Sequence, residues 1–157
     1  MNKIDISVSF DIEHDGELYK ELLAQSRTPG SGFAVLSGSE HFNATEGWSD
    51  RVRHRTRRAD QVIVICGEHT DEAIGVSTEL RIAQEQQKPY FLLWGRRDTM
   101  CTKPLAAKPS DGMYSWTSEI INEQIAGLTR QAHREETARA MKRPERSDSS
   151  GGNVATP

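Results

Sequence analysis

The run QVIVICG, residues 61–67, constrains the fold more than any other stretch of this chain. Val62 to Ile65 are four consecutive β-branched residues, with no polar residue between them. A strand with one face in water alternates apolar and polar residues, whereas a continuous apolar run is typical of a central parallel strand covered on both faces. Parallel strands need long crossover connections, which are usually helices. The run therefore predicts an α/β domain.

The rest of the chain has the alternation of strands and helices that such a sheet requires. We expect further strands at residues 4–10, 33–36 and 90–94, and a short last strand within 113–116. We expect a helix of about three turns with Asp15 as its N-cap, and a second helix at residues 48–58. A third helix should begin near Gly75, and a final long helix at about Thr117. This order predicts a doubly wound parallel sheet of about five strands with helices on both faces.

Length and composition limit the function classes. The 157 residues suit a single domain, which we place at residues 1–141, and the low-complexity segment 142–157 is expected to be a disordered tail. The formal net charge of −3 does not favour nucleic acid or an anionic membrane as a partner. The sequence has no signal-peptide pattern and no apolar run near the ~20 residues that span a bilayer. We therefore expect a cytoplasmic protein.

Three groups of residues have an ordinary interpretation and a functional one. The basic run RVRHRTRR, residues 51–58, is interpreted as the solvated face of a helix, with a surface for an anionic ligand as the alternative. Cys66 is expected to be a buried thiol, and the chain has no CxxC pair. The histidines lack metal-ligand spacing, so no metal site is expected; they are His14, His41, His69, His54 and His133.

In doubly wound sheets the ligand crevice lies beyond the carboxyl ends of the strands, where the strand order reverses. The residues expected there are Phe10 and Asp11, Ser37 and Gly38, and the loop 67–75. No GxGxxG or phosphate-binding loop occurs, and no nucleophile elbow surrounds the serines. Ser37 and Ser39 are therefore interpreted as ordinary loop serines.

Glu79 is an acid next to the apolar stripe of the helix that follows this loop. Val76, Leu80 and Ala83 define the stripe. The acid could interact favourably with the helix dipole from the first turn, or its side chain could extend to water. Alternatively, a carboxylate at the rim of the crevice could stabilise or attack a ribosyl cation. No second acid is needed when the leaving group is a neutral heterocycle, as nicotinamide is when it leaves NAD.

Two segments resemble a known family. VSFDIEHDGELYKELL resembles the opening of TIR-like domains, and RTRRADQVIVICGEHTDEAIGVSTELRIAQEQQKPYFLL resembles their core. The branch that this chain most resembles is the one in the Thoeris anti-phage systems of bacteria. The resemblance covers about Ile4 to Leu128 and is most specific from Cys66 to Pro89.

The resemblance implies a flavodoxin-like TIR fold that cleaves NAD as a substrate, without a separate cofactor. It implies a cyclic ADP-ribose-type messenger for a partner effector, and homo-oligomers through TIR–TIR contacts. Glu79 matches the family's catalytic glutamate. The substrate-binding positions are then Ser9, Phe10, Asp11, Gly75 and Ser77. Many members have Trp where this chain has Gly75, and Trp48 is expected either to fill that space or to lie in the core.

Two other function classes stay open. A nucleoside 2-deoxyribosyltransferase-like enzyme also uses a Glu on a similar sheet, but the Asp-x-Gly pattern usual before that helix fits DEAIGVSTE poorly. A non-catalytic TIR-like adaptor would bind only other TIR domains, and Gly75 in place of Trp is compatible with it.

Overall fold

The protein forms one parallel five-stranded sheet, with strand order β2-β1-β3-β4-β5. The computed structural model describes residues 3–142. The strands are β1 (Ile4–Ser9), β2 (Phe33–Gly38), β3 (Gln61–Cys66), β4 (Tyr90–Trp94) and β5 (Met113–Tyr114), and every neighbouring pair is parallel. This order is that of flavodoxin-like sheets, with the switch point between β1 and β3. The predicted fold class is therefore confirmed.

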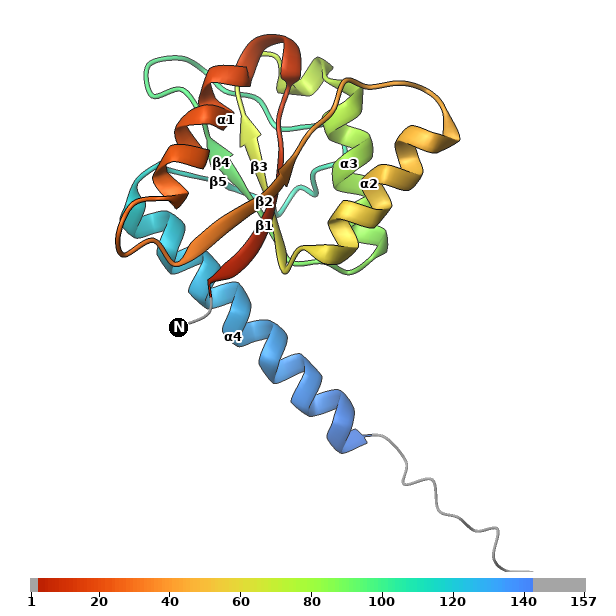
Figure 1. Cartoon of the computed structure of the whole chain (residues 1–157), viewed down its shortest axis with the longest axis vertical. Helices are drawn as coiled ribbons and strands as arrows, with labels where there is room; N and C mark the ends of the chain where they lie inside the picture. The colour runs from red at the N-terminus through yellow and green to blue at the C-terminus, as the bar shows by residue number, and fades with distance from the viewer. Residues whose placement is uncertain (1–2, 143–157) are drawn as a thin grey trace, which may run out of the picture.

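Helices cover both faces of this sheet, as Figure 1 shows. They are α1 (Ile12–Ser26), α2 (Glu46–Arg58), α3 (Ile74–Glu85) and α4 (Ser118–Lys142), with a 3-10 turn at Thr70–Glu72. Helices α1 and α4 pack on one face through residues such as Leu22 and Ile121. Helix α3 covers the other face with Val76, Leu80 and Ala83. Every residue of β3 is buried, as its sequence predicted.

Helix α2 lies outside α3 and is attached to it by a small apolar cluster. Trp48 and Val52 are buried with Ile82 of α3. Trp48 is 1% exposed, so its role is that of a core residue. This arrangement leaves the start of α2 and the preceding loop next to the first turns of α3.

The N-cap prediction for α1 was wrong. Asp11 caps the helix, because its side chain accepts a hydrogen bond from the Glu13 N–H. Asp15 instead lies at a kink, with φ −119° and ψ 20°, and is fully buried. The helix begins earlier than expected because Asp11, two residues after β1 ends, already satisfies a free N–H group of the first turn.

Two further predictions concern the ends of the domain and the cysteines. Helix α4 continues to Lys142, so it includes the first residue of the predicted tail 142–157, and the rest of that tail, from residue 143, lies outside the described residues. Within residues 3–142 no helix has the length and apolar character needed to cross a membrane. Cys66 is fully buried, which confirms the predicted core thiol, and burial raises the pKa of this thiol to about 12.

Candidate active site

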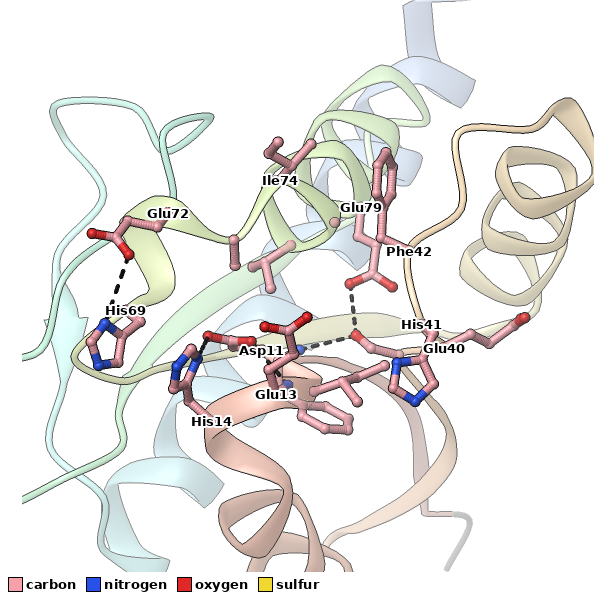
Figure 2. Close-up of a pocket in the computed structure, with 16 residues that line it drawn as sticks. Asp11, Glu13, His14, Glu40, His41, Phe42, His69, Glu72, Ile74 and Glu79 are labelled. Carbon is pink, nitrogen blue, oxygen red and sulfur yellow. Dashed lines mark hydrogen bonds and ion pairs between the residues drawn. The ribbon is translucent and has the colours of Figure 1, made fainter.

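A cavity of about 290 Å³ opens beyond the carboxyl ends of β1, β2 and β3, at the switch point of the sheet. Its walls come from the start of α1 (residues 10–14), the loop after β2 (residues 39–42) and the connection from β3 into α3 (residues 69–76), together with Glu79. Figure 2 shows the Glu79 carboxylate directed into this space from α3. Three segments far apart in sequence therefore meet at the expected place.

Glu79 is buried and held by three donors. Its residue is 6% exposed. The hydroxyls of Ser9 and Ser39 each donate to Oε1 at 2.6 Å, and the Arg55 guanidinium donates to Oε2. Glu79 is the sixth residue of α3, beyond its first turn, and does not extend to water. Both ordinary interpretations of this acid are therefore wrong.

The charge of Glu79 is governed by opposing effects. Burial raises the pKa of its carboxyl above the ordinary value, although hydrogen bonds from Ser39 and Ser9 and the charge of Arg55 act in the opposite direction. A carboxylate has about four acceptor positions, and three of them are used by the described residues. The remaining acceptor position, on Oε2, has no donor among the described residues.

Arg55 corrects the interpretation of the basic run. Most of residues 51–58 do face solvent, but the Arg55 side chain is only 12% exposed and lies against Glu79. Its other terminal nitrogen donates to Glu40 at 2.9 Å, and Arg51 donates to the same carboxylate at 2.9 Å. The spacing of Trp48, Val52 and Arg55 is i, i+4, i+7, which puts the arginine on the inward face of the helix. That spacing could have revealed it.

Ser39 was also missed, since it was interpreted as an ordinary loop serine. Its hydroxyl accepts a hydrogen bond from the Phe10 N–H at 3.0 Å and donates to Glu79. It therefore connects the ends of β1 and β2 to the buried acid. Its position directly after a strand at the switch point was the available signal.

Phe10 and Asp11 line the cavity as predicted. Phe10 is 6% exposed and stacks on Tyr19, with ring centroids 4.6 Å apart. Asp11 accepts a hydrogen bond from His14 Nδ1 at 2.7 Å, and this bond raises the pKa of His14. Ser9 lies behind the wall, in contact with Glu79.

Three histidines that looked scattered in the sequence line one cavity, namely His14, His41 and His69. The rings of His14 and His69 lie 4.2 Å apart. In the described part of the chain, no three potential ligands come together in a way that could hold a metal ion.

Gly75 lines the cavity beside an aromatic ring. A Cβ at this position would lie 3.2 Å from the Cβ of Phe42. Phe42 is 45% exposed and contacts Trp48 edge-on, with centroids 4.9 Å apart. The ring of Phe42 therefore lies where a larger residue at position 75 would project. Figure 2 shows Phe42 among the residues that line the cavity.

Ser77 is not among the residues that line the cavity. Its hydroxyl accepts a hydrogen bond from the Ala106 N–H at 2.9 Å. Its visible role is to attach the irregular segment after β4 to α3.

Comparisons with solved structures give a likeness of fold. No family model matches the chain, and no curated protein matches it. Among solved structures it is similar to a prokaryotic SEFIR domain, with a TM-score of 0.48 and 21% sequence identity. The alignment covers 82% of this chain and 91% of that one.

Proposed function

We propose that this protein cleaves the N-glycosidic bond between nicotinamide and ribose in NAD, with Glu79 as the catalytic carboxylate. The observation that carries the proposal is a buried acid directed into a cavity at the switch point of a parallel sheet. The resemblance of residues 66–89 to TIR-like domains supports NAD as the substrate. A cavity of about 290 Å³ is near the lower end for ligand pockets and suits the nicotinamide riboside half of the molecule.

The chemistry needs an anion close to the sugar. As the bond from C1′ to the ring nitrogen breaks, its electron pair passes to nicotinamide, which becomes neutral, and positive charge develops on the ribose. The Glu79 carboxylate, which is itself buried, stabilises that charge, and electrostatic effects are larger away from bulk water. Water that attacks C1′ and loses a proton to solvent yields ADP-ribose. Attack by a nitrogen of the same molecule's adenine yields a cyclic product.

The charges of the wall fit the cationic nicotinamide end of this substrate. Five acids line the cavity, namely Asp11, Glu13, Glu40, Glu72 and Glu79. Lysine and arginine do not appear among its described lining residues. An acidic wall attracts the cationic nicotinamide ring and the developing ribosyl cation, and loses attraction for the neutral product.

The resemblance to the Thoeris branch extends this proposal to a biological role. The product is then a cyclic ADP-ribose-type signal that reaches a partner effector by diffusion during anti-phage defence. The proposal also includes the assembly of this protein into homo-oligomers through contacts between TIR-like domains. NAD is the substrate in this proposal, which includes no separate cofactor.

A second candidate is a non-catalytic interaction domain, and specific observations favour it. Three protein donors already satisfy most of the Glu79 carboxylate, as a structural ion pair would require. Ile74, at the mouth of the cavity, is 66% exposed, and Phe42 is 45% exposed. Exposed apolar side chains at one site are typical of a protein-binding surface.

Incubation of the purified protein with NAD, followed by chromatography of nicotinamide and ADP-ribose products, separates the two candidates. The enzyme proposal predicts nicotinamide release that is proportional to protein or rises more steeply, if oligomers are active. A parallel incubation with 2′-deoxynucleosides tests the transferase alternative. Absence of nicotinamide release across protein concentrations that include the oligomer contradicts the enzyme proposal and favours the interaction domain.

A further inference from the structure

The contact between Arg55 and Glu79 joins two charges that are almost removed from solvent. The arginine side chain is 12% exposed and the glutamate side chain is 7% exposed. Burial of an ionised side chain is costly unless a partner of opposite charge accompanies it. Arg55 comes from α2 and Glu79 from α3, so the pair connects two helices at the base of the cavity.

The three donors to Glu79 are not equivalent. A serine hydroxyl can donate to a carboxylate or accept from a protonated carboxyl, so Ser9 and Ser39 are compatible with either form. A guanidinium can only donate and is always charged. Arg55 is therefore the one partner of the three whose fixed positive charge favours the anionic form of Glu79.

Arg55 is itself fixed from the opposite side. Its Nη1 donates to Glu40 Oε2 at 2.9 Å, while Arg51 Nε donates to Glu40 Oε1 at 2.9 Å. Glu40 belongs to the loop after β2 that forms one wall of the cavity. The guanidinium thus bridges two carboxylates, and this fixes its orientation toward Glu79.

We propose that Arg55 is the positioning residue of the site: it holds the Glu79 carboxylate in one orientation and in its anionic form. This inference rests on the proposed function for its catalytic meaning. Arg55 does not line the cavity, so it acts through Glu79 rather than on the substrate. Other titratable side chains that face the cavity, and so contribute to the local field, are Asp11, Glu13, His14, His41, His69 and Glu72.

The direct test is the titration of the Glu79 carboxyl, followed by carbon NMR of glutamate-labelled protein and assigned by its loss in Glu79→Gln. Arg55→Met should move this titration upward by about one pH unit or more, because a neighbouring opposite charge lowers a carboxyl pKa by about 1–3 units. Arg55→Lys keeps the positive charge but not the planar set of guanidinium N–H donors, so a smaller upward change in the Glu79 titration is expected. Arg53→Met, an exposed site on the same helix, should leave the titration as in the wild type.

Catalysis supplies the second measurement. In Arg55→Met the acid limb of the pH profile for nicotinamide release should move upward with the Glu79 titration, and Arg55→Lys should restore part of it. A Glu79 titration unchanged in Arg55→Met overturns the inference. If Arg55→Met does not fold, an unchanged titration in Arg55→Lys overturns it. If the wild type releases no nicotinamide, the proposed function fails, while the titration still decides the role of Arg55.

Discussion

Gly67, directly after β3, is in close contact with the buried carboxyl of Asp15 in α1. A Cβ at residue 67 would lie 2.3 Å from Asp15 Oδ2, 2.5 Å from Oδ1 and 2.7 Å from Cγ. Asp15 is fully buried, and its Oδ1 accepts a hydrogen bond from Arg96 at 2.9 Å. The glycine backbone cannot retreat easily, because its N–H donates to Thr70 at 2.7 Å and its carbonyl accepts from Thr102 at 2.8 Å.

Gly67→Ala should therefore destabilise the protein strongly. Overpacking of a rigid interior costs about 1–3 kcal/mol, and loss of the Asp15–Arg96 hydrogen bond adds about 1–3 kcal/mol. A smaller gain, about 0.4–1 kcal/mol, comes from the stiffer unfolded chain. We expect a net loss of about 2–5 kcal/mol in the free energy of unfolding, a large part of the 5–15 kcal/mol typical of a domain.

Urea unfolding, followed by circular dichroism, measures this loss. Gly16→Ala is the matched control, because no atom lies within 4 Å of the added Cβ, and it should raise stability by up to about 1 kcal/mol. If the contact with Asp15 is the cause, Gly67→Ala in an Asp15→Ala background should cost at least about 1 kcal/mol less than alone. A Gly67→Ala variant as stable as the wild type, or an unchanged cost in that background, refutes the reasoning.

Two further predictions follow from single contacts. Burial outweighs Arg96 and raises the pKa of Asp15 above its ordinary 3.8, so the native state binds this proton more tightly than the unfolded chain does. This stabilising contribution is lost as the pH rises from below 3.8 through the native pKa, so Asp15→Asn should gain stability relative to the wild type over that interval. Urea unfolding at several pH values measures the difference in stability, and a constant difference would contradict the assignment. If Phe42 stacks on the substrate ring, Phe42→Ala should raise the KM for NAD about 5-fold or more, because stacking on an aromatic side chain contributes about 1–3 kcal/mol. Phe42 is 45% exposed, so the melting temperature should change little, and an unchanged KM would exclude the stacking.

The fold was predictable because its signals are local. The β-branched run of β3, the alternation in β1 and the helical spacing of α2 and α3 can each be identified from a few neighbouring residues. The position of the cavity followed from the strand order, which those elements imply. The N-cap of α1 was misplaced because Asp11 and Asp15 are both good capping residues, and burial decides between them.

The partners of Glu79 were harder to predict, because they are distant in sequence. Ser9, Ser39 and Arg55 are separated from it by 70, 40 and 24 residues. A single sequence does not indicate which polar side chains meet across such distances. Arg55 carried a weak signal in its helical spacing, but the neighbouring exposed arginines concealed it. The contact of Phe42 with Gly75 depends on a loop conformation that no local pattern predicts.

The central claim is that the charge of Glu79 drives cleavage of NAD, and the rate of nicotinamide release by Glu79→Gln tests it most directly. Glutamine keeps the shape and the hydrogen-bonding capacity but removes the charge, so kcat should fall at least ~10²-fold with little change in KM. Glu85→Gln, an exposed site at the end of the same helix, is the control and should match the wild type. A folded Glu79→Gln protein that releases nicotinamide at the wild-type rate would contradict the account.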